Sequence, residues 1–193
     1  SWRLDPARSG AAGCMADIGA HAENLLEYVT GLRIHSLCAD LSSFVEGRLL
    51  DDDGNVLLRL ANGARGILYA SQIAAGEEND LSIRVYGEKG GLVWRQMAPN
   101  TLIVRRLDGP EQHYRTGMDY LHPEAKAHTR LPAGHPEGFI EAFANVYRNV
   151  AHCIRARLES TAPDPLLEDF PTVHDGVRGM RFIAAVGKSS KAG

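Results

Sequence analysis

Residues 55–73 read NVLLRLANGARGILYASQI, in which two apolar runs flank the dipeptide Asn62-Gly63. Asn-Gly between two apolar runs is the strongest short-range signal for a hairpin, so this stretch predicts an antiparallel β-hairpin. The same kind of pattern predicts five other strands, which lie at Ile34–Phe44, Leu81–Tyr86, Leu92–Gln96, Thr101–Arg106 and Glu111–Arg115. The middle of the chain therefore predicts a mostly antiparallel sheet.

Helical patterns precede and follow these strands along the sequence. Apolar residues recur at helical spacing over Asp17–Thr30, and Gly31 is suited to end that helix. Residues 117–135 show no clear period and predict a long loop. An amphipathic helix is expected from Pro136, with Phe143 buried on its apolar face, and a last helix follows a proline-rich connector. This order predicts an α+β fold: a large, mostly antiparallel open sheet with helices packed on one face.

The composition is that of a single globular domain over residues 1–193, with 21 Lys and Arg against 24 Asp and Glu and a net charge of −3. The near-neutral charge predicts neither nucleic acid nor a membrane as a partner, and no apolar run reaches the roughly 18–20 residues of a spanning helix. Three widely separated cysteines predict reduced thiols in the cytoplasm. The histidines of residues 113–135 lack zinc-site spacing, so we expect no metal.

Asp17 and His21 lie four residues apart, which places them on one face of the expected helix. A carboxylate beside an imidazole can fix its tautomer and raise its basicity, as proton abstraction from a hydroxyl requires. The spacing alone fits two interpretations. Either the pair forms an acid–base site, or Asp17 caps the helix and His21 is an ordinary surface or core histidine.

Several short motifs follow one another along the chain: Trp2-Arg3-Leu4-Asp5-Pro6, Asp17-Ile18-Gly19-Ala20-His21, Tyr86-Gly87-Glu88-Lys89-Gly90-Gly91, Ala133-Gly134-His135-Pro136-Glu137-Gly138-Phe139 and Pro171-Thr172-Val173-His174-Asp175-Gly176. In these motifs the chain resembles the C-terminal domain of the glucose–fructose oxidoreductase/inositol dehydrogenase family (Gfo/Idh/MocA). The resemblance implies an N-terminal Rossmann domain that binds NAD(P) and that this chain lacks. No Gly-x-Gly-x-x-Gly follows an expected strand, so we expect no cofactor-binding residue here.

The resemblance also implies roles for single residues near the start of the chain. His21 is expected to be the catalytic acid/base, with Asp17 as its partner or as a contact to a substrate hydroxyl. Trp2, Arg3 and Asp5 lie just upstream of the helix. They are expected either to grip a polyol substrate or to brace the two domains against each other.

Two candidates for substrate contact lie further along the chain. His135 is expected at the start of a helix, whose N-terminus favours a neutral imidazole that can hydrogen-bond a sugar hydroxyl. The alternative for His135 is a loop or capping histidine. Gln72, on a strand of otherwise apolar residues, is a weaker candidate, for which a solvent position on the open sheet face is the preferred interpretation.

These expectations describe an NAD(P)-dependent oxidoreductase that acts on a hydroxyl of a sugar, cyclitol or related carbohydrate. The substrate and the choice between NAD and NADP stay open, and the chain alone is expected to be inactive. The alternative is a non-catalytic oligomerisation or ligand-sensing domain. The open sheet face, with Tyr69, Tyr86 and Trp94, is expected to join copies of the chain into a homo-oligomer.

Overall fold

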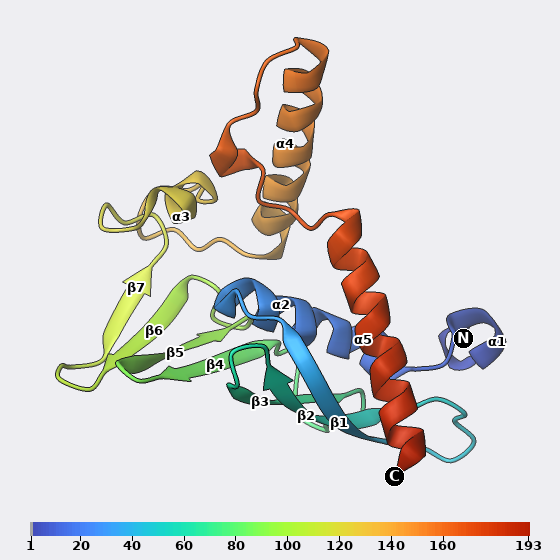
Figure 1. The fold of residues 1–193 in the computed structure, drawn as a ribbon. Helices are drawn as coiled ribbons and strands as arrows, with labels where there is room; N and C mark the ends of the chain where they lie inside the picture. The colour runs from blue at the N-terminus through green and yellow to red at the C-terminus, as the bar shows by residue number, and fades with distance from the viewer. Residues whose placement is uncertain (1) are drawn as a thin grey trace. The chain divides into compact units, whose positions relative to one another are not determined.

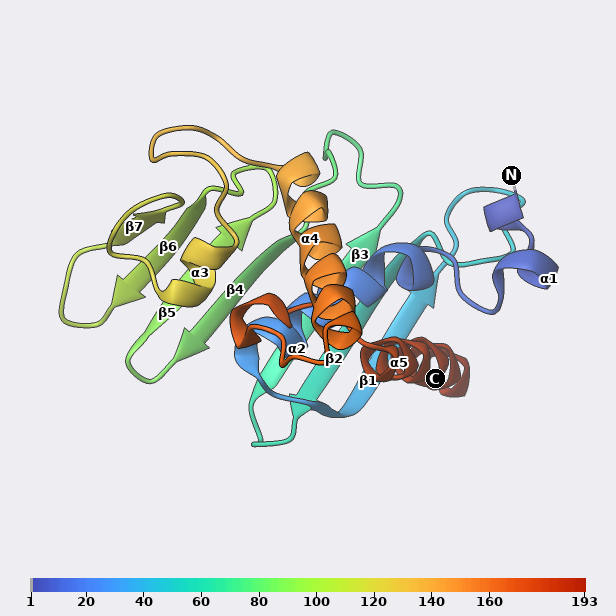
Figure 2. The same ribbon diagram turned by 90° about the horizontal axis from the view of Figure 1, so that it is seen from above.

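The computed structural model describes residues 2–193, except for the side chain of Arg3. The chain divides into two compact units. The first comprises Ser1–Glu78 and Val173–Gly193, and the second comprises Asn79–Thr172. Each unit contains a sheet and several helical segments (Figure 1, Figure 2).

The sheet of the first unit is antiparallel and has the order β1 (Ile34–Ser42), β2 (Asp53–Leu60), β3 (Arg65–Ser71). The expected hairpin is present between β2 and β3. Leu60 N donates to Ala64 O at 2.8 Å, and Gly63 has a φ of 88°. Buried and exposed residues alternate along β2. One face of this sheet therefore carries the core, and the other face is open.

The helical segments described in the first unit are η1 (Trp2–Leu4), α1 (Pro6–Ser9), η2 (Met15–Gly19), α2 (Ala20–Thr30) and α5 (Val173–Ala192). The helix expected over Asp17–Thr30 begins differently, because residues 15–19 form a π-helical turn and the α-helix starts only at Ala20. Its end is as predicted. Gly31 has a φ of 67° and donates its N–H to Glu27 O at 2.9 Å.

The core of the first unit lies between its sheet and the helical segments η2, α2 and α5. Met15 from η2, Val56 from β2 and Val186 from α5 are fully buried. Leu58 and Phe182 pack in the same cluster and are almost completely buried. This packing fixes η2 against the sheet, and η2 is the segment that carries Asp17.

The sheet of the second unit is also antiparallel, with the order β4 (Ser82–Gly87), β5 (Gly90–Arg95), β6 (Thr101–Arg106), β7 (Gln112–Arg115). Its described helical segments are α3 (Pro123–Ala127), α4 (Phe139–Leu158) and η3 (Pro165–Leu167). The start of α4 lies beyond the predicted Pro136. Gly138 caps the helix and donates its N–H to the Glu141 carboxylate at 2.8 Å, so Pro136 belongs to the preceding loop.

The apolar stripe of α4 is exposed, which corrects the expectation that Phe143 is buried. Its side chain is 51% exposed and stacks at a tilt on Phe139, with 4.7 Å between the ring centroids. The residues that α4 buries include polar ones. Asn145 and Asn149 are buried, and Asn145 Nδ2 donates to His128 O at 2.6 Å. Hydrogen bonds therefore hold the preceding loop to the helix.

The predicted α+β class with antiparallel strands is confirmed. The strands are distributed over two sheets of three and four strands, however, and not over one large sheet. Alternation of apolar residues predicts that a segment is a strand, but it does not predict which segments pair, and the irregular segment 72–81 separates β3 from β4. Among the described residues, no helix is long and apolar enough to cross a membrane.

Candidate functional site

The segment before α2 is anchored by Asp51, which lies in the loop between β1 and β2. The Asp51 carboxylate accepts the N–H groups of Gly13 at 2.6 Å and Met15 at 2.7 Å, and Asp51 O accepts Cys14 N at 2.8 Å. A Cβ atom at position 13 would clash with Asp51 O, so this close approach requires glycine. Asp51 therefore fixes the backbone from which η2 begins.

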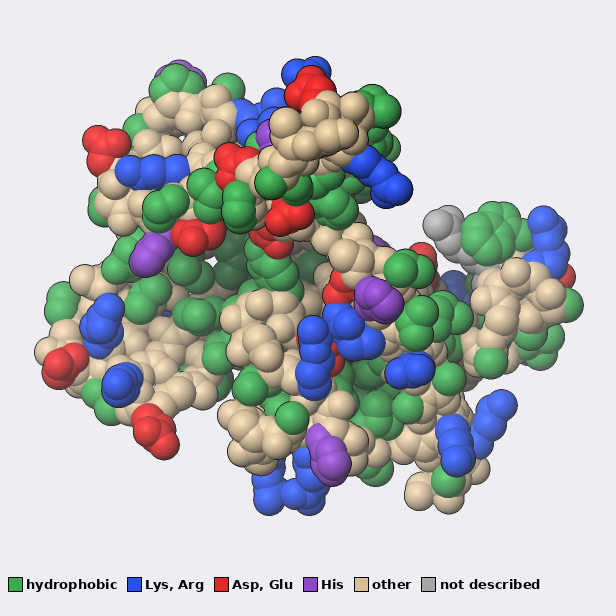
Figure 3. Space-filling model, turned by 45° about the horizontal axis from the view of Figure 1, so that its top comes forward, with side chains coloured by type: hydrophobic (Ala, Val, Ile, Leu, Met, Phe, Trp, Pro, Cys, Tyr) green, Lys and Arg blue, Asp and Glu red, His purple; other side chains and the backbone are tan. Residues whose placement is uncertain are grey.

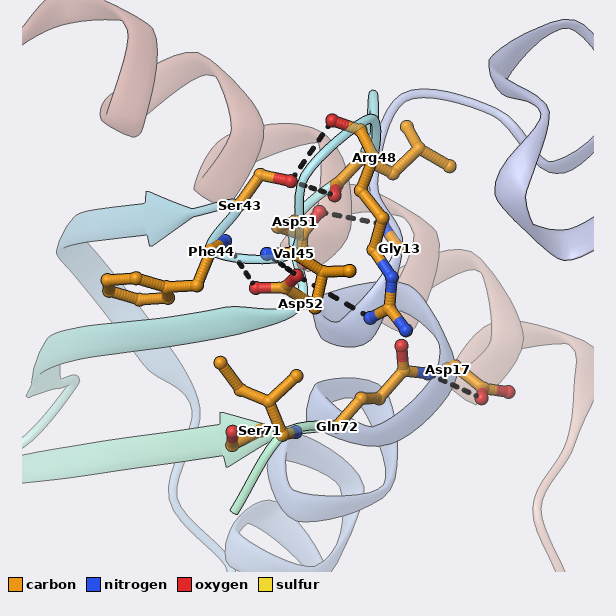
Figure 4. Close-up of polar contacts among 12 residues, drawn as sticks. Gly13, Asp17, Ser43, Phe44, Val45, Arg48, Asp51, Asp52, Ser71 and Gln72 are labelled. Atoms are coloured by element: carbon orange, nitrogen blue, oxygen red, sulfur yellow. Dashed lines mark hydrogen bonds and ion pairs between the residues drawn. The ribbon is translucent and has the colours of Figure 1, made fainter. Parts of the chain in front are cut away.

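The π-helical turn η2 presents Asp17 to solvent at the end of β3. Gln72 directly follows β3, and its Nε2 donates to Asp17 Oδ2 at 3.1 Å (Figure 4). Single π-helical turns occur frequently at functional sites, because they shift the side chains that follow around the helix axis. The carboxylate of Asp17 is thus held by a residue that is distant in the sequence.

A third polar side chain, Arg48, comes from the loop between β1 and β2 and is positioned by Asp52. Asp52 is fully buried and accepts Phe44 N and Val45 N at 2.9 Å each. The hydrogen bond from Phe44 N is the main cause that lowers the pKa of Asp52, so this carboxylate is ionised. Arg48 Nη1 lies 3.5 Å from Asp52 Oδ2, and the Arg48 side chain extends towards Gln72 (Figure 4).

These groups line a pocket of about 350 Å³ in the first unit. Its wall includes Trp2, Leu4, Asp17, Arg48, Asp51 and Gln72. A carboxylate accepts hydrogen bonds, a guanidinium donates them, and an amide does both. Together with an indole and a leucine side chain, this set suits a small ligand that carries several hydroxyl groups on an apolar frame.

Two of the residues predicted from the sequence, Asp17 and Trp2, meet in this pocket. Asp5 has a local role, since its carboxylate accepts Ala7 N at 2.9 Å and caps α1. The side chain of Arg3 lies outside the described residues. His21 lies in the first turn of α2 with an exposed side chain, and no described residue forms a hydrogen bond or ion pair with it. The predicted Asp17–His21 contact is therefore not formed.

His135 belongs to the second unit, where it lines a separate cavity of about 540 Å³ with Asn100, Thr116 and Glu137. Its Nδ1 lies 3.2 Å from Pro132 O. The expectation that His135 stands at a helix N-terminus is wrong, because α4 starts only at Phe139. The argument that a helix dipole keeps its imidazole neutral therefore does not apply.

From the sequence, Gln72 is only a weak candidate for substrate contact, and Arg48 is not a candidate at all. The signal for Gln72 was a polar residue at the end of an apolar strand, and the structure shows that it faces Asp17 rather than the open sheet face. Arg48 lies in an irregular loop, so no periodicity indicates where its side chain points.

Cys14 lies next to the pocket but is not a candidate nucleophile. It is fully buried, and burial is the main cause that raises the pKa of its thiol to about 12, with Asp51 adding to the effect. Only the thiolate is strongly nucleophilic, so Cys14 acts as a packing residue.

Comparison with known proteins shows that domains of this fold occur in oxidoreductases. Residues 1–93 match the family model described as GFO/IDH/MocA C-terminal domain. An oxidoreductase from Sinorhizobium meliloti is 44% identical, with a TM-score of 0.88 over 93% of this chain and 50% of its own. An inositol dehydrogenase homolog from Azotobacter vinelandii, solved with NAD+, is 34% identical, with a TM-score of 0.91 over 100% of this chain and 50% of its own. The uncharacterized oxidoreductase YfiI of Bacillus subtilis is 33% identical over 100% of this chain and 49% of its own.

The chain belongs to the Gfo/Idh/MocA family of oxidoreductases and corresponds to its C-terminal domain. It spans about half the length of the relatives that it matches. The resemblance noted in the sequence motifs is confirmed by these comparisons.

Proposed function

We propose that the protein is an NAD(P)-dependent oxidoreductase that acts on a hydroxyl of a sugar, cyclitol or related carbohydrate, and that this chain binds the substrate. The observation that carries the proposal is the pocket in which Asp17, Gln72 and Arg48 converge beside Trp2. A polyol supplies the hydroxyl groups that these side chains can bind. Further support comes from the A. vinelandii homolog, which has been solved with NADH and myo-inositol, a cyclitol.

In this proposal His21 takes the proton of the reacting hydroxyl, and its exposed position leaves the imidazole accessible to a substrate. Asp17 is bonded to Gln72 and not to His21, so the carboxylate serves as a contact to a substrate hydroxyl. The other proposed substrate contacts in this pocket are Gln72, Arg48 and Trp2. The roles that the sequence resemblance implies for Arg3, Asp5 and His135 in substrate binding stay proposals.

The nicotinamide cofactor, which would accept the hydride, is assigned to a part of the protein outside this chain. Every strand pair among the described residues is antiparallel. That part of the chain accordingly has no strand–helix–strand unit whose helix N-terminus could hold a pyrophosphate. The residues present do not fit NAD(P), and we propose that the chain alone is inactive.

We further propose that the protein is a cytoplasmic homo-oligomer. All three cysteines are free thiols, as expected in a reducing compartment. On the open face of the first sheet, Leu57 and Ile67 face each other across β2 and β3 and are 59% and 75% exposed. Tyr69 extends this apolar surface, which a second copy can cover. The same surface favours the second candidate function, a non-catalytic oligomerisation or ligand-sensing domain.

Steady-state kinetics of the full-length protein, with a panel of cyclitols and aldoses that includes myo-inositol, tests the proposal. His21→Ala should lower kcat/KM by about 10²–10⁴-fold, the usual contribution of a general base. Asp17→Asn should mainly raise KM, because the variant keeps its shape but loses the charge that binds a hydroxyl. The control His113→Ala removes an exposed histidine of β7 and should leave the kinetics unchanged. A His21→Ala variant whose kcat/KM equals that of the wild type would favour the non-catalytic alternative.

A further inference from the structure

The first unit contains a second cavity, a groove of about 670 Å³ between α2, β1 and α5. Its lining residues are different from those of the pocket around Asp17. One wall is formed by Arg178, Arg181 and Lys188 of α5, and the floor includes Leu37 and Phe182. In the space-filling view, Lys and Arg side chains gather beside α5 (Figure 3). The groove is therefore apolar at its base and basic along one side.

Two of these cations are available to a ligand. Arg178 pairs with Glu27 and Asp175, and so does not need another anion. Arg181 and Lys188, in contrast, form no ion pair with any described residue. They lie seven residues apart on α5, which is two helical turns, so they point in the same direction about 10 Å from each other.

The groove also exposes part of the edge of β1. The hydroxyl groups of Ser189 and Ser190 accept Ala39 N and Leu41 N at 3.0 Å each, so α5 covers the edge amides at that end of the strand. Outward-facing amides alternate along a strand, which places the N–H of Leu37 on the same edge, within the groove. Apart from bonds between the paired strands, no described group accepts this N–H.

The opposite wall holds a carboxyl group without a partner. Glu23 is 4% exposed, lines the groove and forms no hydrogen bond or ion pair with any described residue. Burial is the main cause that raises its pKa to about 7, and the neighbouring Glu27 adds to the effect. The carboxyl group of Glu23 can therefore accept a hydrogen bond from a ligand that lies in the groove.

We propose that this groove binds a short, extended acidic peptide segment of a partner protein. The peptide adds to the edge of β1 at Leu37, as extended ligands do at free strand edges, and its carboxylates pair with Arg181 and Lys188. From Arg178 to Lys188 the wall is about 15 Å long, which corresponds to about five extended residues. The peptide backbone supplies the hydrogen-bond donor for Glu23, and the apolar side chains between the acidic ones pack on Phe182.

Fluorescence anisotropy of the full-length protein tests this proposal with a labelled hexapeptide of alternating valine and glutamate. Arg181→Glu and Lys188→Glu should each weaken binding by about tenfold, since each reverses a charge that faces the peptide. The matched control is Lys191→Glu, which makes the same charge change in the same helix at a residue outside the groove and should leave binding unchanged. Circular dichroism of each variant shows that the fold is retained.

Four results would overturn the proposal. The first is absence of peptide binding, and the second is equal binding of a valine–lysine hexapeptide. The third is complete displacement of the peptide by inorganic phosphate at equal concentration, which would make the groove a site for small anions. The fourth is a change of oligomeric state in Arg181→Glu measured by sedimentation, which would make a second copy of this chain the occupant.

Discussion

Replacing Glu23 by glutamine should stabilise the protein, and the gain should grow as the pH rises. Burial and the charge of Glu27 raise the pKa of Glu23, with Asp175 adding to this, whereas Arg178 and Arg33 act in the opposite direction. The pKa is about 7 in the folded protein against an ordinary value of 4.5. Folding therefore favours the protonated carboxyl, and this stability is present at low pH and is lost as the pH rises through about 7.

The size of the effect follows from the two pKa values. A change from 4.5 to about 7 corresponds to about 3 kcal/mol of destabilisation once the carboxyl is ionised in both states. Glutamine has nearly the same shape and no charge, so the Glu23→Gln variant is not destabilised by ionisation of this side chain. Between about pH 5.5 and about pH 8.5 the variant should gain about 2 kcal/mol over the wild type, because part of the cost is already present at the lower pH.

Urea unfolding at these two pH values measures the difference. The control is Glu46→Gln, which removes the charge of an exposed glutamate in the loop between β1 and β2 and should show no such pH dependence. A Glu23→Gln variant whose stability relative to the wild type is the same at both pH values would refute the reasoning. It would show that Glu23 is not desolvated in the folded protein.

Two further predictions concern the framework of the fold. Asp51→Ala removes the two hydrogen bonds that the Asp51 carboxylate accepts from the backbone before η2, so the free energy of unfolding should fall by about 3 kcal/mol. The control Asp40→Ala, at an exposed position of β1, should change it little. Leu58→Ala should cost about 2–5 kcal/mol because Leu58 is 2% exposed, whereas Phe143→Ala should cost only about 1 kcal/mol because its ring is half exposed. Equal losses for these two substitutions in urea titrations would show that α4 is buried in solution.

The parts of the fold that local chemistry decides could be predicted from the sequence. Asn62-Gly63 produces the hairpin because glycine accepts the positive φ of 88° found at position 63. Gly31 ends α2 for a similar reason, with a φ of 67°. In both places the signal and the structure lie within a few residues of each other, so no knowledge of distant contacts was needed.

Which face of α4 is buried could not be predicted from the sequence of the helix alone. Its apolar stripe is real, but amphipathicity indicates only that one face differs from the other, and the choice of the buried face depends on what packs against it. The structure buries Asn145 and Asn149, because the loop before the helix supplies hydrogen-bond partners such as His128 O. Such partners are set by tertiary contacts that a pattern within one helix does not contain.

The contacts in the candidate site also depend on tertiary structure. Helical spacing predicts Asp17 and His21 on one face of a regular α-helix, but η2 is a π-helical turn, which displaces the side chains that follow around the axis. The hydrogen bond goes instead to Gln72, 55 residues away along the chain. Asp17 is thus held by Gln72, whereas His21 forms no hydrogen bond with a described residue. Their substitutions should affect substrate binding and proton transfer separately, which is what the comparison of KM with kcat in the two variants measures.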